Sequence, residues 1–483
     1  MVLGTTSGAG KSWLATALCR WYARQGLKVA PFKAQNMSNN ARVVPGGGAL
    51  GLLSSGGEIG AAQYFQALAA RAEPDVRMNP LLLKPEGDTA SQVVLLGRVD
   101  EELSRTPWRG RSERVWPAIA QSLDALRAEN DVVVIEGAGS PAEINLAASD
   151  IVNLRVARHA GARCLLVTDI DRGGAFAHLH GTWALMEAGD RARIAGFVLN
   201  KFRGDASLLA PGPQMLQDRT GVPTVAVLPM WWRHGLPEED GVFDDRLSAA
   251  GEVRLTVAVV AYPRISNLDE FQPLKNVPGL RLVWARSPAQ LAGADWVILP
   301  GSKHTSGDLA WLRAQQLDRA IAAHAAQGKP VLGICGGLQM LGEALIDPHD
   351  IDGNAPGLGL LPLVTQFERE KTVRRTVTRF GAVQGAWSAL AGVEVRGYEI
   401  HHGITAQHAA MAPGVPVLPD GLGWQNAAGN VLGVYLHGLF EDANVVHALF
   451  GTQAPSLDAV FDGLADFIDA HFEPGFLQSL IRG

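Results

Sequence analysis

Short, strongly apolar runs that alternate with helical segments constrain the fold of this 483-residue chain more than any other feature. The runs form two series, at residues 27–32, 131–137, 162–170, 193–200 and 223–229, and at residues 253–263, 281–286, 294–302, 329–335 and 429–438. Uninterrupted Val, Ile and Leu are typical of strands buried on both faces, as in parallel sheets covered by helices. The sequence therefore predicts an α/β chain with two doubly wound parallel sheets.

A break between the two series predicts the domain organisation. Residues 231–252 are rich in charges and turn formers and lack a clear period, which indicates a linker or lid. A chain of this length exceeds what one core usually serves. We therefore expect domains at 1–230 and 253–450, joined by this linker and followed by a helical tail at 451–483. Apolar residues at helical spacing in the tail predict that it packs on the second domain.

Composition narrows the class of protein. Charged residues make up 19% of the chain, the net charge is -6, and the basic residues are scattered. This balance argues against nucleic acid as the main partner and favours a small-molecule substrate. The few, widely separated cysteines predict a reducing compartment. Because we find neither a signal-peptide pattern nor an apolar run of about 18 residues, we expect a cytoplasmic protein without membrane contact.

The stretch "GTTSGAGKS" at residues 4–12 has the pattern of a phosphate-binding loop. Such a loop surrounds phosphate with backbone N–H groups, while a lysine adds charge and a hydroxyl meets Mg²⁺. We assign these roles to Gly8, Gly10, Lys11 and Ser12. The strict pattern needs glycine at position 5, where Thr5 stands, so the loop is a variant with its first glycine at Gly4. Only two residues precede that glycine, which leads us to expect a native start further upstream.

Polar residues after the other strands of the first series extend this candidate site. Glu136 follows a buried run, where a carboxylate would hold Mg²⁺. Asp171, in "DIDRGG", is placed for metal, substrate or phosphate contacts, and Asn200 for reading a nucleotide base. Lys33 follows the second strand and is placed to neutralise a transferring phosphoryl group. Alternatives remain for three of them: a plain strand-end acid for Glu136, a structural use for Asp171, and a solvated loop lysine for Lys33.

"KPVLGICGGLQML" predicts a strand, a sharp turn and a helix, with Cys335 at the turn. A helix N-terminus lowers a thiol pKa and points N–H groups at an oxyanion, so we interpret Cys335 as a nucleophile. His437, at the end of a later strand, is a candidate base, with His401 and His402 as rivals. The N–H of Gly301 in "LPGSKHT" is placed to complete an oxyanion hole.

These motifs carry a resemblance. G-x-C-x-G-x-Q at 333–339, the downstream histidine and the upstream "PG" turn resemble the class I glutamine amidotransferases, whose domain is flavodoxin-like. The first half resembles the dethiobiotin-synthetase type of ATP-dependent carboxylate activator. Their fusion in this order, with "PFKAQNMSNN", "EIGAAQ", "MNPLLLKP", "GAGSPAEINL", "DIDRGGAFA" and "GYEIHHG", is similar to the cobyric acid synthase family of cobalamin biosynthesis.

The resemblance implies a ligase that takes ammonia from glutamine and uses ATP and Mg²⁺ to activate a corrinoid carboxylate as an acyl phosphate. For this family the substrate is adenosylcobyrinic acid a,c-diamide, which is amidated at its b, d, e and g carboxylates. It further implies Cys335 as nucleophile, His437 as base, Gly336 and Gly301 as oxyanion donors, and Gln339 near the thioester.

For the ATP site the resemblance implies that Lys33 bridges phosphate and carboxylate. The ATP and Mg²⁺ set would be Lys11, Ser12 and Glu136, with Glu143 and Asp171 as further acidic candidates.

One position departs from the amidotransferase pattern and leaves a question open. The acid expected two residues after the histidine is replaced by Leu439, so His437 works either in a dyad or with Glu441 or another acid. Three other readings stay open: cobyrinic acid a,c-diamide synthase, a partitioning ATPase, and a regulatory protein with an inactive amidotransferase domain. A partitioning ATPase would carry a lysine at position 6, which is Thr6, and would have no use for Cys335.

Overall fold

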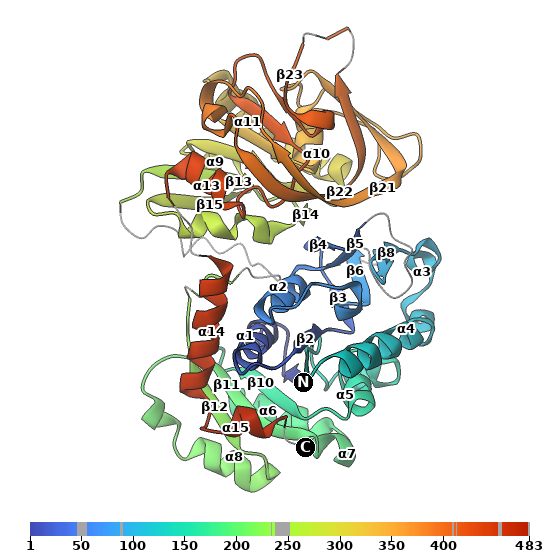
Figure 1. The fold of residues 1–483 in the computed structure, drawn as a ribbon, viewed down its shortest axis with the longest axis vertical. Helices are drawn as coiled ribbons and strands as arrows, with labels where there is room; N and C mark the ends of the chain where they lie inside the picture. Colours follow the sequence, from blue (N-terminus) through green and yellow to red (C-terminus); the bar gives the residue numbers. More distant parts are fainter. Residues whose placement is uncertain are drawn as a thin grey trace.

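Two α/β units, each with its own parallel sheet, make up the structure, a computed structural model (Figure 1). It describes residues 1–45, 56–86, 90–232, 234–236, 252–407, 410–411, 413–452 and 456–481. We call residues 1–232 together with 456–481 the first unit, and residues 252–452 the second unit. The predicted linker at 231–252 lies largely outside the described residues.

The first unit is built on parallel strands in the order β2, β9, β1, β10, β11, β12. The last four form one sheet, and an isolated bridge from Val2 to Glu136 joins the β2–β9 pair to it. Their bounds are β1 Val2–Gly4, β2 Val29–Phe32, β9 Val132–Ile135, β10 Cys164–Asp169, β11 Ile194–Phe202 and β12 Thr224–Pro229. The helices around them are α1 Lys11–Arg24, α4 Trp108–Glu129, α5 Leu154–Ala160, α6 Ala175–Leu185, α7 Ala188–Arg191 and α8 Gly212–Thr220. The predicted apolar runs thus form the sheet.

A smaller mixed β layer is inserted between β2 and α4. It contains β3 Gln35–Met37, β4 Ala41–Val44, β5 Gly57–Gly60, α2 Ala61–Ala69, β6 Leu81–Pro85, β7 Ser91–Leu95, β8 Arg98–Val99 and α3 Glu101–Arg105. β4 and β5 form an antiparallel pair, and this pair faces the second unit (Figure 1).

The second unit has a seven-stranded sheet in the order β15, β13, β16, β18, β25, β24, β23, of which the first five strands are parallel. Their bounds are β13 Leu255–Val260, β15 Leu280–Ala285, β16 Trp296–Leu299, β18 Val331–Ile334, β23 Val415–Leu418, β24 Gly423–Gln425 and β25 Val431–Val434. The helices are α9 Pro288–Leu291, α10 Thr305–Ala314, α11 Leu317–Ala326, α12 Gly336–Leu341 and α13 Ala443–Phe450.

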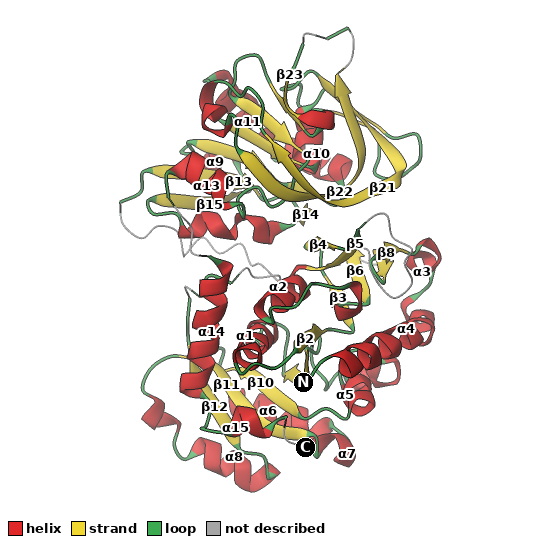
Figure 2. Ribbon diagram, in the orientation of Figure 1, coloured by secondary structure: helices red, strands yellow, loops and turns green. Residues whose placement is uncertain are grey.

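Shorter strands and one long hairpin complete the second unit (Figure 2). They are β14 Ile265–Ser266, β17 Gly301–Ser302, β19 Ala344–Ile346, β20 Ala355–Pro356, β21 Leu363–Arg379 and β22 Glu394–Gln407. The antiparallel β21–β22 pair extends toward the first unit, where Arg375 donates to the carbonyl of Val43 at 3.1 Å.

The helical tail packs on the first unit, not on the second as the sequence led us to expect. α14 (Leu457–His471) lies beside α1, and α15 (Phe476–Ser479) follows it (Figure 1). Phe461, Leu464 and Ile468 of α14 are buried in the same apolar core as Leu14 and Leu18 of α1. The apolar stripe had been predicted correctly, but such a stripe does not specify which surface it covers.

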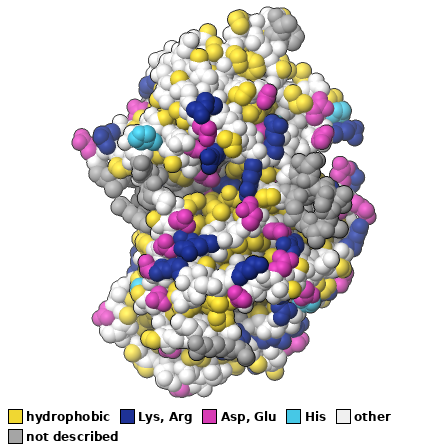
Figure 3. Space-filling model, in the orientation of Figure 1, with side chains coloured by type: hydrophobic (Ala, Val, Ile, Leu, Met, Phe, Trp, Pro, Cys, Tyr) yellow, Lys and Arg dark blue, Asp and Glu magenta, His cyan; other side chains and the backbone are white. Residues whose placement is uncertain are grey.

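On the face drawn in Figure 3, the basic and acidic side chains of the described residues are interspersed. Among the described helices, none combines the length and apolar character needed to cross a membrane.

Candidate active sites

The loop after β1 has the backbone of a phosphate cradle. Gly8 and Gly10 adopt the left-handed conformation, with φ of 72° and 97°, which favours glycine. A Cβ on Gly10 would also lie 2.1 Å from Nδ2 of Asn200. The departure from the strict pattern has a physical reason: Thr5 uses its hydroxyl to bond Thr168 of β10 at 2.9 Å, which anchors the loop to the sheet.

Lys11 begins α1 and folds back over this loop. Its Nζ donates to the carbonyls of Thr6 at 3.0 Å and Gly139 at 3.1 Å. A Cβ on Gly4 would lie 2.9 Å from that nitrogen, so a glycine at position 4 makes room for the lysine. The cation therefore lies between the cradle and the loop that follows β9, where a phosphate group would need it.

Glu136 gathers several of the predicted residues at the carboxyl edge of the sheet. Its Oε1 accepts from Ser12 at 2.7 Å and from Lys33 at 2.8 Å, and its Oε2 accepts from Gln66 of α2 at 2.6 Å. Burial opposes ionisation, but Lys33 and these hydrogen bonds outweigh it and lower the pKa of Glu136. Gln66 was not predicted from the sequence, because it carries no signal beyond lying just after "EIGAAQ".

The other predicted polar residues of the first unit are placed differently. Asn200 donates to the carbonyl of Ala9 at 2.9 Å and thereby braces the cradle, while Asp171 accepts from Arg203 at 2.6 Å. Glu143 is exposed, and within the described residues no hydrogen bond or ion pair joins it to Ser12 or Glu136. Three roles stay predictions: recognition of the nucleotide base by Asn200, phosphate contact by Asp171 and metal binding by Glu143.

In the second unit, Cys335 stands at a sharp turn between β18 and α12. Its φ of 50° and ψ of −106° place a non-glycine residue in a strained conformation, which is common at active sites. The flanking glycines allow the strand and the helix to approach each other. A Cβ on Gly333 would lie 2.6 Å from the backbone of Gly337, and one on Gly337 would lie 1.9 Å from the carbonyl oxygen of Leu299.

His437 follows β25 and lies close enough to Cys335 for the two side chains to interact electrostatically, while the thiol itself donates to the carbonyl of Ile400 at 3.6 Å. Nδ1 of His437 lies 3.1 Å from Oε1 of Glu270, and the other oxygen of that carboxylate accepts from the N–H of Gly438 at 2.9 Å. Burial lowers the pKa of His437, but Glu270 and Cys335 outweigh it and raise the pKa to about 10. This Cys–His–Glu arrangement is that of a nucleophile, its base and an orienting acid.

Glu270 therefore occupies the position for which Glu441 had been a candidate. Glu441 instead accepts from Arg42 at 2.5 Å. Glu270 belongs to the 3₁₀ segment Leu268–Asn276 and is 167 residues away from His437 in sequence. No local spacing could have found it.

The rival histidines make other contacts. His401 bonds the carbonyl of Gly403 at 2.8 Å and stacks on Tyr435, and His402 bonds the carbonyl of Glu368 at 3.1 Å. Burial lowers the pKa of His402 to about 4, so it is neutral near pH 7.

The predicted oxyanion and glutamine residues surround the same turn. A Cβ on Gly301 would lie 2.7 Å from the His437 ring, and one on Gly336 would lie 2.8 Å from the N atom of Ser302. Gln339 is buried and bonds Thr305 at 3.2 Å and the hydroxyl of Tyr435 at 3.3 Å. These contacts place all three beside Cys335 or His437 or in the helix that Cys335 begins; their roles stay predictions.

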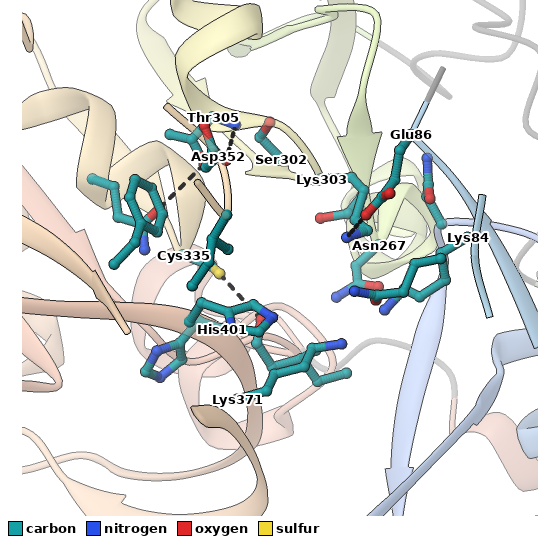
Figure 4. Close-up of a pocket in the computed structure, with 18 of the residues that line it drawn as sticks. Lys84, Glu86, Asn267, Ser302, Lys303, Thr305, Cys335, Asp352, Lys371 and His401 are labelled. Atoms are coloured by element: carbon teal, nitrogen blue, oxygen red, sulfur yellow. Dashed lines mark hydrogen bonds and ion pairs between the residues drawn. The ribbon is translucent and has the colours of Figure 1, made fainter. Parts of the chain in front are cut away.

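Both units line the pocket that contains Cys335. Lys84 and Glu86 of the first unit face Cys335 and His401 across it (Figure 4). Lys303 pairs with Glu86 at 2.8 Å, which closes one side of the pocket with a contact between the units. The site around Cys335 is thus lined by side chains of both units.

Comparison with known proteins bears on both halves. Residues 1–238 match the family described as the CobQ/CobB/MinD/ParA nucleotide binding domain, and residues 256–445 match the CobB/CobQ-like glutamine amidotransferase domain. A cobyric acid synthase of Variovorax paradoxus is 79% identical over 482 residues, which cover 100% of this chain and 98% of that protein. The chain belongs to the cobyric acid synthase family.

Other relatives agree. A cobyric acid synthase of Polaromonas naphthalenivorans is 74% identical over 488 residues, which cover 100% of this chain and 99% of that protein. A solved glutamine amidotransferase covers 44% of the chain at 17% identity with a TM-score of 0.31, too low to bear on the fold. Family membership confirms the resemblance drawn from the motifs, and the α/β fold class is confirmed as well. The nucleotide-binding and amidotransferase domains fit the use of ATP and of glutamine.

Proposed function

We propose that this chain uses ATP and glutamine to amidate the b, d, e and g carboxylates of adenosylcobyrinic acid a,c-diamide, which gives cobyric acid. The observation that carries the proposal is the presence, in one chain 79% identical to a cobyric acid synthase, of a Cys–His–Glu arrangement and a phosphate cradle beside Glu136. Neither the partitioning ATPase nor the regulatory alternative needs both sites.

Glutamine hydrolysis falls to the second unit. His437 takes the proton of the Cys335 thiol, and Sγ attacks the side-chain amide carbon as a thiolate. The C–N bond then breaks, and ammonia leaves with the proton of the His437 imidazolium, which Glu270 holds in place. Water then cleaves the thioester and releases glutamate. Backbone N–H groups of Gly301 and Gly336 are the proposed donors to the oxyanion.

Activation of the carboxylate falls to the first unit. The γ-phosphoryl group of ATP passes to a corrinoid carboxylate oxygen and gives ADP and an acyl phosphate; ammonia then attacks the acyl carbon, and phosphate leaves. A carboxylate is a poor electrophile, so this step supplies its leaving group. Lys11 lies at the cradle, where it bonds Gly139, and Lys33 bonds Glu136. Both cations would offset the negative charge that builds up where the ATP phosphate meets the corrinoid carboxylate.

Magnesium fits the residues present. Oγ of Ser12 and Oε1 of Glu136 lie 2.7 Å apart at the cradle, and the pKa of Glu136 is lowered, so hard oxygen donors of the kind Mg²⁺ prefers are in place. Bound by Ser12 and Glu136, Mg²⁺ would neutralise charge on the ATP phosphates.

Mass spectrometry of the corrinoid tests the proposal. The full chain is incubated with adenosylcobyrinic acid a,c-diamide, ATP, Mg²⁺ and glutamine, and we expect stepwise conversion of up to four carboxylates to amides. Cys335→Ala should amidate with ammonia only, because it lacks the nucleophile, and Lys11→Met should release glutamate yet amidate poorly with either nitrogen source.

A parallel incubation with cobyrinic acid addresses the nearest alternative. Amidation of that substrate at its a and c carboxylates alone, with the a,c-diamide left unchanged, would replace the proposal by cobyrinic acid a,c-diamide synthase. No mass change in either corrinoid would contradict both.

A further inference from the structure

The first unit contacts the amidotransferase site through β4. The N–H of Ala41 donates to Oδ1 of Asn267 at 3.0 Å, and the N–H of Leu268 donates to Oδ1 of Asn40 at 2.9 Å. These reciprocal bonds attach β4 to the segment that leads directly into Glu270. The two units therefore meet at the segment that supplies the orienting acid.

Arg42, the next residue of β4, reaches further into the second unit. Its side chain is 1% exposed and donates to the Tyr398 hydroxyl, to the Asp269 carboxylate and, at 2.5 Å, to Oε1 of Glu441. The guanidinium carbon lies 5.3 Å from the ring centroid of Phe65 and 5.0 Å from that of Tyr398. A planar guanidinium suits such a fork of acceptors, because its N–H groups diverge in one plane.

Each polar partner of Arg42 is a direct neighbour of the catalytic groups. Asp269 precedes Glu270 in the chain. The Tyr398 ring stacks on His437 with centroids 5.4 Å apart, and their backbones exchange hydrogen bonds of 3.2 and 2.9 Å. The N–H of Glu441 bonds the carbonyl of Gly438, the residue after His437, at 3.0 Å. Arg42 thus ties together the segments that carry Glu270 and His437.

From this arrangement we infer that Arg42 is a positioning residue of the glutaminase, supplied by the nucleotide-binding half of the chain: it holds Glu270 and His437 in line with Cys335. The inference rests on the proposed function for the nature of the reaction. Without Arg42, the carboxylates of Asp269 and Glu441 would lose their cation within a buried cluster, and a buried charge that loses its partner is costly. The segment would then shift, and small displacements of catalytic groups lower the rate steeply.

The test compares Arg42→Met and Arg42→Lys with the unchanged full chain. Glutamate release gives kcat and KM for glutamine, amidation of the corrinoid with ammonia reports on the first unit, and a thermal melt reports on folding. We expect Arg42→Met to lower the kcat for glutamate release by about a hundredfold. KM and ammonia-dependent amidation should stay within about threefold of the unchanged chain, because neither the pocket nor the first site is touched.

Arg375→Met is the matched control. Arg375 is also an arginine between the units, and its side chain bonds Val43 and Glu73. Its backbone pairs with Tyr398 across the β21–β22 ladder, but among the described residues its side chain forms no hydrogen bond or ion pair with Tyr398, Asp269 or Glu441, and the substitution changes only that side chain. It should leave glutamate release unchanged. Arg42→Lys keeps the positive charge but lacks the planar set of diverging N–H groups. We therefore expect an intermediate loss, about tenfold, in the kcat for glutamate release.

A kcat of Arg42→Met or Arg42→Lys equal to that of the unchanged chain would overturn the inference, and so would an equal loss in Arg375→Met. If Arg42→Met melts far below the unchanged chain, the inference is judged on Arg42→Lys instead. An equal loss of glutamate release and of ammonia-dependent amidation in Arg42→Lys would also count against the inference. The proposed function fails separately: no corrinoid amidation by the unchanged chain would refute it, while the comparison of glutamate release between variants would still stand.

Discussion

At the scale of single residues, His437 shows how neighbours decide the form of a catalytic group. Burial alone would leave the ring neutral, yet the Glu270 carboxylate at 3.1 Å and the negative charge of the Cys335 sulfur in its ionised form raise the pKa of His437 to about 10. The imidazolium is therefore the resting form near neutral pH. The proposed reaction needs this form, because it can donate a proton to departing ammonia.

The Glu270→Gln variant tests this electrostatic assignment. An amide keeps the shape but removes the charge that favours the imidazolium, so the pKa of His437 should fall from about 10 toward its ordinary value of 6.5. In a pH series of kcat for glutamate release, the decline on the alkaline side should then begin at lower pH.

Glu399→Gln is the comparison, because Glu399 contacts His401, one of the rival histidines, at 3.4 Å. It should leave the alkaline decline where it is in the unchanged chain. A shift in Glu399→Gln and none in Glu270→Gln would assign the proton donor to His401.

At the scale of elements, the turn between β18 and α12 depends on close backbone approach. Alanine usually favours a helix over glycine by about 1 kcal/mol. At Gly337 the added Cβ would lie 1.9 Å from the backbone oxygen of Leu299, and backbone cannot yield as a flexible side chain can. The steric term therefore outweighs helix propensity here.

Gly337→Ala should accordingly lower the free energy of unfolding by about 1–3 kcal/mol, the usual cost of overpacking. Gly181→Ala is the matched control, since Gly181 lies within α6 and a Cβ there meets no atom within 4 Å. It should be neutral or stabilising by up to about 1 kcal/mol. Denaturant unfolding of both variants measures the difference, and equal stabilities would contradict this account.

Elements are also the scale at which the sequence was most informative. The strands of both parallel sheets were predictable because burial on both faces leaves a continuous apolar run, as in β10, where all residues are buried. The pairs β4–β5 and β21–β22 were not: β4 and β5 are buried, but Arg42, Glu58 and two glycines interrupt their apolar residues, and β21 is largely exposed or half-buried. The site residues divide in the same way into those that the sequence predicts and those that it does not. Cys335 and Ser12 lie in local motifs, whereas Glu270, Gln66 and Arg42 reach their sites through contacts distant in sequence.

At the scale of the whole molecule, α14 makes the first unit discontinuous in sequence. Beyond its apolar face, it holds α1 by polar contacts: the buried Arg20 pairs with Asp458 and Asp462, each at 2.8 Å, and Trp21 donates to Asp469 at 2.7 Å. The second unit is thus inserted between two parts of the first.

Removing the apolar contact of α14 should destabilise the first unit strongly. Phe461 is 1% exposed in the core shared with α1, so Phe461→Ala is expected to lower the free energy of unfolding by about 3–5 kcal/mol. Asp466→Ala, which breaks only the surface pair with Arg24, should cost at most about 1 kcal/mol. Equal effects in denaturant unfolding would show that the tail is merely attached at the surface.

The position of α14 in the chain also affects the order in which the protein can mature on the ribosome. The apolar face of α1 emerges early, but the helix that covers it is translated only after residues 252–452. At elongation rates of about 5–20 residues per second, that interval lasts roughly 10 to 40 s. The nascent first unit therefore presents an uncovered apolar surface throughout synthesis of the second, which makes this surface a natural point of contact for chaperones.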